Sequence, residues 1–329
     1  MEMLKRIALP LIATVACAGG AFKDQARDAM PSKQAISMGS PASQPQASST
    51  SGSSTIAQNS TAGDRSQFHD LTVAVAVVFN VPTAAFLDLL RHVVEDYDPT
   101  SCDATSCTWG PGSDPLSRVD YKLVVSRDAD GVSFDWALSG AVKPGTNFIT
   151  FASGVATPGP QRHHGSGKFK IDFDAAANLA IFGDPAQDTQ ATGTMDVKSY
   201  SNVGPASLAV DFLGARDDKQ PTQRNNILYT YANDTTGGGD LDFAMHNTTT
   251  GDRFSVHSRW KNDGRGRADV AGLGGGYDVK LSECWGPAPF IVTYFSALTM
   301  APPPWGGPDS GDVSQCAYSS AAFSSSSAP

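Results

Sequence analysis

Residues 241–260 read LDFAMHNTTTGDRFSVHSRW, in which apolar and polar side chains alternate on both sides of a central run of turn-forming residues. A period of two residues places one set of side chains on one face of a pleated strand and the other set on the opposite face. The central residues 247–252 are Asn, Thr, Gly and Asp, which favour turns. The stretch predicts two antiparallel strands joined by a turn. Its large apolar residues are Leu241, Phe243 and Met245, then Phe254, Val256 and Trp260.

The same alternation extends over residues 167–295, with turn-forming clusters at 233–239 and 262–266. Turns about every ten residues, with no helical pattern between them, favour antiparallel pairing. Of the 33 acidic residues only three are Glu, and Asp favours turns where Glu favours helices. We therefore predict a mainly β fold: one antiparallel β-meander domain over residues 67–318, forming a barrel or a strongly curved sheet of about twelve strands.

The segment before the meander contains one predicted helix. Residues 71–79 are nearly all Val and Ala and are interpreted as a buried strand. Pro82 and Thr83 then open a helix of about fourteen residues that ends before Pro99 and packs on the sheet. Further strands are predicted at 119–126, 132–138 and 147–155.

The two ends of the chain are predicted to lie outside the domain. Residues 1–17 resemble a lipoprotein signal peptide, with Lys5 and Arg6 before an apolar stretch and Cys17 as the lipidation site. An ordinary secretory signal cut after Ala18 is the alternative. Residues 18–66 are rich in Ser, Ala and Gln and predict a disordered tether, and residues 319–329 predict a disordered tail.

The cysteines indicate an oxidising compartment. If Cys17 carries lipid, four remain, an even number suited to disulfides. We predict that Cys102 pairs with Cys107 and Cys284 with Cys316. A zinc site is the rival interpretation, but the chain lacks the paired spacing of Cys or His that such sites use.

Several constellations could carry chemistry, and each has a simpler structural explanation. His246 and His257 could face one another across a turn and bind a metal, and His163 and His164 form a loop pair. Asp128 and Asp130 before Gly131 resemble the start of a calcium loop, but the later Glu is absent and a hairpin turn explains them. The Asp172/Asp174 and Asp240/Asp242 pairs fit solvated strand surface. Gly-x-Ser-x-Gly is absent, and we predict no catalytic residue, metal or cofactor.

The most distinctive residues lie in the last third of the meander. Arg259, Arg267, Asp269 and Glu283 are predicted to form a salt-bridge network beside two tryptophans, holding the end of the sheet. With the signal, the Ser-rich tether and Cys316, this pattern resembles uncharacterised predicted lipoproteins of myxobacterial type. The resemblance implies no known activity.

These observations predict an exported, lipid-anchored protein of the bacterial cell envelope. The net charge is −9, and −10 once residues 1–16 with Glu2, Lys5 and Arg6 are removed, which disfavours nucleic acid as a partner. The predicted role is non-catalytic binding or structure, with an apolar ligand or lipid held in a cavity lined by Phe212, Phe243 and Met245. A secreted hydrolase with Asp and His on loops is the alternative.

Overall fold

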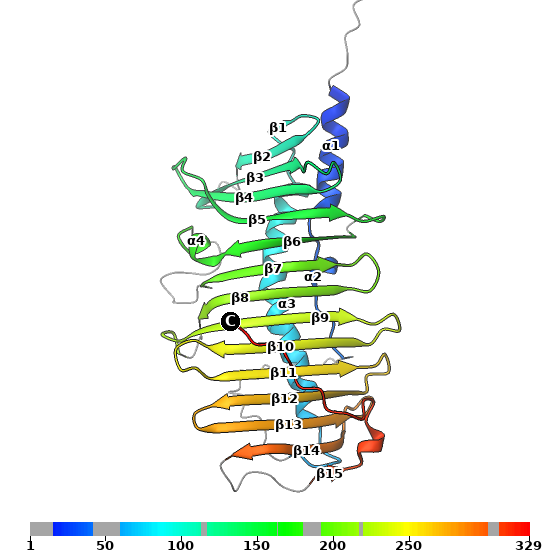
Figure 1. Ribbon diagram of the computed structural model, residues 1–329. Coiled ribbons are helices and arrows are strands. Elements are labelled where there is room, and N and C mark those ends of the chain that lie inside the picture. The colour runs from blue at the N-terminus through cyan, green and yellow to red at the C-terminus, as the bar shows by residue number, and fades with distance from the viewer. Residues whose placement is uncertain are drawn as a thin grey trace, which may run out of the picture.

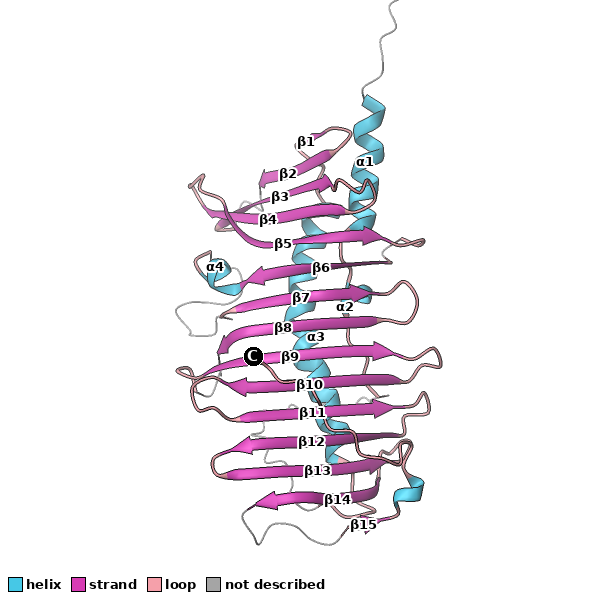
Figure 2. Ribbon diagram, in the orientation of Figure 1, coloured by secondary structure: helices cyan, strands magenta, loops and turns pink. Residues whose placement is uncertain are grey.

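The protein is built on one open sheet of fifteen antiparallel strands that follow one another in sequence order (Figures 1 and 2). The computed structural model describes residues 16–41, 60–112, 117–162, 164–179, 192–216, 220–301 and 309–329. The predicted mainly β meander with a packed helix is confirmed. The sheet is not closed into a barrel, because each of its two end strands pairs with only one neighbour. It also has more strands than the sequence predicted, because short strands flank both ends.

The strands are β1 (Ser101–Cys102), β2 (Ser106–Gly112), β3 (Val119–Arg127), β4 (Phe134–Val142), β5 (Ile149–Pro158), β6 (Gly165–Asp172), β7 (Thr194–Ser201), β8 (Ser207–Arg216), β9 (Arg224–Asn233), β10 (Gly239–Asn247), β11 (Arg253–Trp260), β12 (Gly266–Gly274), β13 (Tyr277–Trp285), β14 (Val292–Ala301) and β15 (Ser310–Gly311). The helices are α1 (Ala16–Ala29), α2 (Lys33–Ile36), α3 (Gln67–Glu95), α4 (Phe173–Ala177) and the 3-10 helix η2 (Val313–Gln315). The three strands predicted before the meander are confirmed as β3, β4 and β5.

Helix α3 is the second layer of the fold, and it includes the residues predicted to form a buried strand. It is a single 29-residue helix that passes through Pro82, so the predicted strand at 71–79 is wrong. A run of Val and Ala fits a buried strand and a buried helix equally well. Here the buried residues recur with helical spacing, which identifies the segment as helix. Ser66 caps the helix by accepting a hydrogen bond from the His69 amide. The buried side chains recur at every third or fourth position: Phe68, Thr72, Val75, Phe79, Thr83, Phe86 and Leu90.

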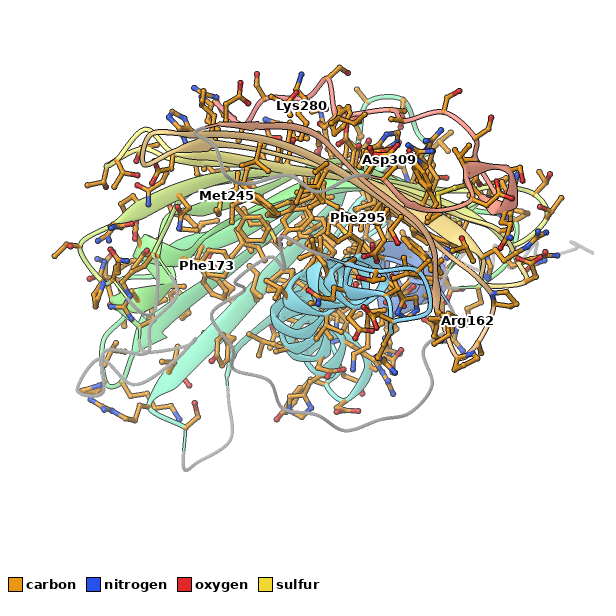
Figure 3. All side chains as sticks on the ribbon, turned by 90° about the horizontal axis from the view of Figure 1, so that it is seen from below. Arg162, Phe173, Met245, Lys280, Phe295 and Asp309 are labelled. Atoms are coloured by element: carbon orange, nitrogen blue, oxygen red, sulfur yellow. A yellow bond between two sulfur atoms is a disulfide. The ribbon has the colours of Figure 1, made fainter. Side chains whose placement is uncertain are left out.

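The aromatic core lies between α3 and the sheet. The Phe79 ring meets the rings of Phe212 and Tyr229, with centroids 6.4 and 5.6 Å away. The α3 helix is long and apolar enough to cross a membrane by length and composition, properties that core helices share. Here it lies along the sheet and covers the apolar face (Figure 3). We call this side the helix face and the opposite side the tail face.

Glycines on the helix face make room for two tryptophan rings. Gly239 and Gly266 lie opposite Trp260 and Trp285 in the strand register. A Cβ added to either glycine would collide with the ring beside it. Both rings are buried. The two glycines therefore leave the space in which the tryptophan rings opposite them pack into the core.

Part of the predicted tether is folded. Helix α1 places Phe22 against Phe134, and the Met38 amide and carbonyl bond to the Asn80 side chain of α3. The predicted disorder at 18–66 is therefore corrected for residues 18–41 and 60–66, because apolar side chains of this segment pack against α3 and the sheet. Residues 42–59 and the signal residues 1–15 lie outside the described part. Cys17 falls in the first turn of α1.

Both predicted cysteine pairs are present. Cys102 and Cys107 face each other in the β1–β2 register, and Cys284 joins Cys316 with Cα atoms 5.5 Å apart. The end strands β1 and β15 have two residues each. Short end strands offer few free backbone groups to another chain. The second cysteine pair also fixes the start of the C-terminal segment on the tail face.

Candidate functional site: a stripe that holds the C-terminal tail

The C-terminal residues 316–329, which we call the tail, cross the tail face from β13 to β9 (Figure 1). The sequence predicted disorder for 319–329, from a composition of Ser and Ala. The structure instead places these residues along the sheet, held by side chains of five strands. The tail has no helix or strand of its own, so contacts with the strands of the sheet hold it in place.

The strand register brings the holding side chains into two rows. Asp240, Arg259, Arg267 and Cys284 are neighbours across β10 to β13. Asp242, His257, Asp269 and Ser282 form the next row. Side chains of one row share a face because directly opposite residues of paired strands point the same way. The two rows share that face because every second residue of a strand points to the same side. We call these rows, with Asn226, His246 and Arg253 beside them, the tail stripe.

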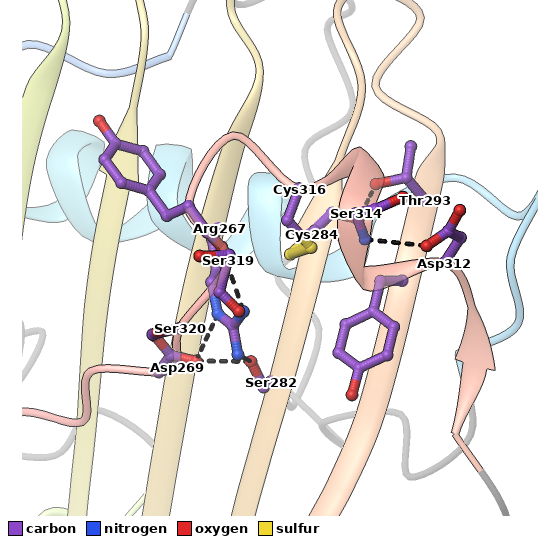
Figure 4. Close-up of a disulfide and its surroundings, with 12 residues drawn as sticks. Arg267, Asp269, Ser282, Cys284, Thr293, Asp312, Ser314, Cys316, Ser319 and Ser320 are labelled. Atoms are coloured by element: carbon purple, nitrogen blue, oxygen red, sulfur yellow. Dashed lines mark hydrogen bonds and ion pairs between the residues drawn. A yellow bond between two sulfur atoms is a disulfide. The ribbon is translucent and has the colours of Figure 1, made fainter.

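The centre of the tail stripe is a buried ion pair. Arg267 and Asp269 are 3% and 0% exposed, and the Arg267 Nε donates to Asp269 Oδ1 over 3.0 Å. Ser282 donates to the same carboxylate oxygen and accepts from Arg267 Nη2 (Figure 4). A buried charge is tolerated when it is paired and its other hydrogen bonds are made. Arg267, Asp269 and Ser282, which we call the triad, therefore form a buried polar base beneath the tail.

The triad binds the main chain of the tail. Arg267 Nη1 donates to the carbonyls of Tyr318 and Ser319 at 3.1 and 3.0 Å. Asp269 Oδ2 accepts from the Ala322 amide at 2.8 Å. Hydrogen bonds in which one partner is charged are stronger than neutral ones. This part of the stripe binds groups that every extended non-proline residue carries.

Arg259 extends the contact toward β11. Its Nη2 donates to the Ser320 carbonyl at 3.0 Å, and its guanidinium lies 4.7 Å from the centre of the Tyr318 ring. Lys261 approaches the same ring at 4.6 Å. Tyr318 is thus the aromatic anchor of the tail.

The tail's last residues are held at the edge of the stripe. Asn226 Nδ2 and His246 Nδ1 contact the main-chain oxygen of Pro329 at 2.8 and 3.0 Å. Arg253 donates to Ala328, and Ser326 donates to Asp242. His246 and His257, considered above as a possible metal pair, share a face but are not register partners: His246 lies opposite Arg253 and His257 opposite Asp242. They contact different tail residues, Pro329 and Ala322.

His257 is positioned between two acceptors. Its Nδ1 contacts the Ala322 carbonyl at 2.6 Å, and its Nε2 contacts Asp240 Oδ1 at 2.9 Å. A carbonyl and a carboxylate only accept, so both contacts are hydrogen bonds only when the ring carries a proton on each nitrogen. The hydrogen bond to Asp240, with that to Ala322, raises the pKa of His257 above its ordinary 6.5. Below its raised pKa, His257 therefore binds the tail with a proton on each ring nitrogen.

This geometry predicts that the tail loosens as the pH rises. The groups facing His257 are Asp240 and Asp242 of β10, Asp269 of β12 and the Ala322 carbonyl. Because the pKa of His257 is raised in the folded state, its contribution is complete below the ordinary value of 6.5 and is lost as the pH rises through the raised pKa. Between about pH 5.5 and about pH 8.5 we expect amide exchange in residues 317–329, corrected for intrinsic rates, to become about tenfold faster. Loss of this pH dependence in His257→Gln is the control, and equal corrected exchange at both pH values in the unsubstituted protein would contradict the assignment.

Glu283 does not belong to the network in which it was predicted. Its register partner on β12 is Ala268, one residue out of step with Arg267 and Asp269, so it points to the helix face. There it accepts from the Ser66 hydroxyl and the Phe68 amide at 2.5 and 3.0 Å. Burial raises the pKa of this carboxyl. The ion pairs predicted among Arg259, Arg267 and Asp269 are thus confirmed, but the two tryptophans lie on the helix face and not beside them. Glu283 instead fixes the first turn of α3.

The other candidate residues have structural roles. Asp172 caps α4 by accepting from the Ala175 amide, and Asp174 accepts from the Gly193 amide. Asp130 accepts from two amides of the β3–β4 turn, as the hairpin interpretation predicted. His164 contacts the Asn202 carbonyl, and His163 lies outside the described residues. Within the described ranges no group of three His, Cys, Asp or Glu could hold a metal ion.

The three residues predicted to line an acyl-chain cavity are on the helix face. Phe243 is buried, and Phe212 and Met245 are partly buried against the same core. Phe79 of α3 packs against Phe212, so the helix occupies the space that the prediction assigned to a ligand. An apolar pocket of about 260 Å³ lies elsewhere, at the C-terminal end of α3. Its lining includes Leu89, Val93, Tyr97, Trp109, Pro111 and Tyr121.

Comparisons with known proteins add no relative. No protein-family model, curated protein or solved structure matches the chain.

Proposed function

We propose that this chain is an exported, lipid-anchored protein of the bacterial cell envelope with a non-catalytic binding or scaffolding role. The observation that carries the proposal is the tail stripe. Its charged side chains do not converge on one point, as catalytic groups do; they are spread along a path and bind main-chain groups over residues 318–329. Such an arrangement suits the holding of an extended polypeptide.

The alternative of a hydrolase is less well supported by this geometry. His257 and Asp240 form a His–Asp contact on the tail face. Both ring nitrogens are engaged, one by Asp240 and one by the Ala322 carbonyl, so neither is available to take a proton from a nucleophile. Binding explains this pair more directly than proton transfer.

The proposed location rests on the signal and the cysteines. Cys17 follows an apolar stretch in the manner of a lipoprotein signal. The other four cysteines lie in two close pairs, as expected in an oxidising compartment. If the role includes a small apolar ligand, the pocket beside Trp109 fits one better than the helix face, because α3 side chains already fill that face.

The anchor is tested by Cys17→Ser. Without the thiol no lipid can be attached, so we expect the protein to move almost completely from the membrane fraction to the soluble fraction of its native host. Immunoblots of the two fractions measure this. Ala18→Ser is the matched control and should stay with membranes. If Cys17→Ser sediments with membranes to the same extent as the unsubstituted protein, the anchor is wrong.

A further inference from the structure

We propose that the tail stripe is a binding site for an extended, uncharged, Ser- and Ala-rich segment of a partner polypeptide, and that residues 317–329 are its intramolecular occupant. The inference deepens the proposed binding role and rests on it. The partner would displace the tail and lie along the same path across β9 to β13. The tail itself shows what kind of chain the stripe accepts.

The stripe binds chiefly the backbone of its occupant. Arg267, Arg259 and His257 contact carbonyl oxygens, and Asp269 accepts from an amide. These groups recur in any extended segment, so a second chain could make the same bonds. Aromatic contacts at Tyr318 and Phe323, the latter 5.6 Å from the Lys280 ammonium, add side-chain recognition.

The charges of the stripe favour a neutral partner. Arg267 and Arg259 are both paired with Asp269, and Asp240 is paired with His257. A partner side chain of either charge, placed along this path, would lie within a few ångströms of a stripe residue with the same sign of charge. Small uncharged residues avoid that repulsion, and ten of the thirteen residues in AYSSAAFSSSSAP at 317–329 are Ser or Ala.

The tail can be exchanged because its attachment is local. Cys316 is joined to Cys284, but beyond that point only hydrogen bonds and ring contacts hold it. A cavity of about 230 Å³ remains beside residues 326–328, lined also by Arg253 and Lys280. A partner segment with larger side chains at this end would therefore still fit.

The test uses the full chain with one tail residue changed. Ala322→Pro removes the amide that donates to Asp269, whereas Ala322→Gly keeps it and is the matched control. The probe is a fluorescent synthetic peptide with the sequence of residues 317–329, and anisotropy measures its binding. We expect Ala322→Pro to bind it about tenfold or more tightly than the unsubstituted protein or Ala322→Gly, because its own tail competes less well. The peptide carrying the same Ala→Pro change should bind weakly to all three.

Two results would overturn the inference. The first is that hydrogen exchange shows the tail of Ala322→Pro to be released, but the peptide does not bind saturably to this variant. The other is a tail whose exchange is unchanged by Ala322→Pro, because main-chain recognition would then not hold it. Either result leaves the membrane fractionation of Cys17→Ser untouched, so failure of this inference is distinguishable from failure of the proposed location.

Discussion

Replacing Asp269 with alanine is expected to lower the free energy of unfolding by about 3–5 kcal/mol. The substitution leaves Arg267, which is 3% exposed, as a buried charge without its carboxylate. It also removes the acceptor for the Ser282 hydroxyl and the Ala322 amide. Chemical denaturation at constant pH measures the loss, and hydrogen exchange should show the tail released at the same time.

The control for this substitution lies in the neighbouring row. Asp240→Ala removes a carboxylate whose side chain is 55% exposed, and exposed ion pairs contribute at most about 1 kcal/mol. Combining Asp269→Leu with Arg267→Met removes both buried charges and should recover much of the stability, while the tail stays released. A small loss for Asp269→Ala, equal to that of Asp240→Ala, would show that the triad is not the base of the stripe.

Phe86→Ala is expected to cost about 3–5 kcal/mol, for a different reason. The Phe86 ring is buried in α3 and packs against Trp136 and Phe169, with centroids 6.3 and 5.8 Å away. Removing it leaves a cavity between α3 and strands β4 and β6. Thermal and denaturant unfolding measure the effect, which should appear as loss of the whole domain's stability.

The matched control is on the other side of the same helix. Val78 is 64% exposed, so Val78→Ala deletes methyl groups that pack little and should change stability by about 0.5 kcal/mol or less. If the two substitutions cost the same, α3 would not be the layer that covers the helix face. The difference between the two losses therefore measures how much the packing of α3 on the sheet contributes to stability.

The alternation of apolar and polar residues was enough to predict the antiparallel meander. A period of two is a local property of each strand, so Leu241, Phe243 and Val256 identify a buried face before any partner is known. The cysteine pairs were also predictable, because four cysteines have few arrangements and Cys102 and Cys107 are close in the chain. The Val and Ala run at 71–79 was not, since its composition fits a strand and a helix alike until packing against Phe212 and Tyr229 decides.

The tail stripe depended on the tertiary structure. The sequence singled out Arg259, Arg267 and Asp269, but only the strand register separates them from Glu283 and puts them on the face that α3 leaves open. The ordered path of the tail could not be predicted from its composition. The hydrogen bonds that hold it join side chains of distant strands to main-chain groups, which all residues share. What the sequence by itself determined is the two-faced sheet; which face receives the helix and which the tail was decided by long-range packing.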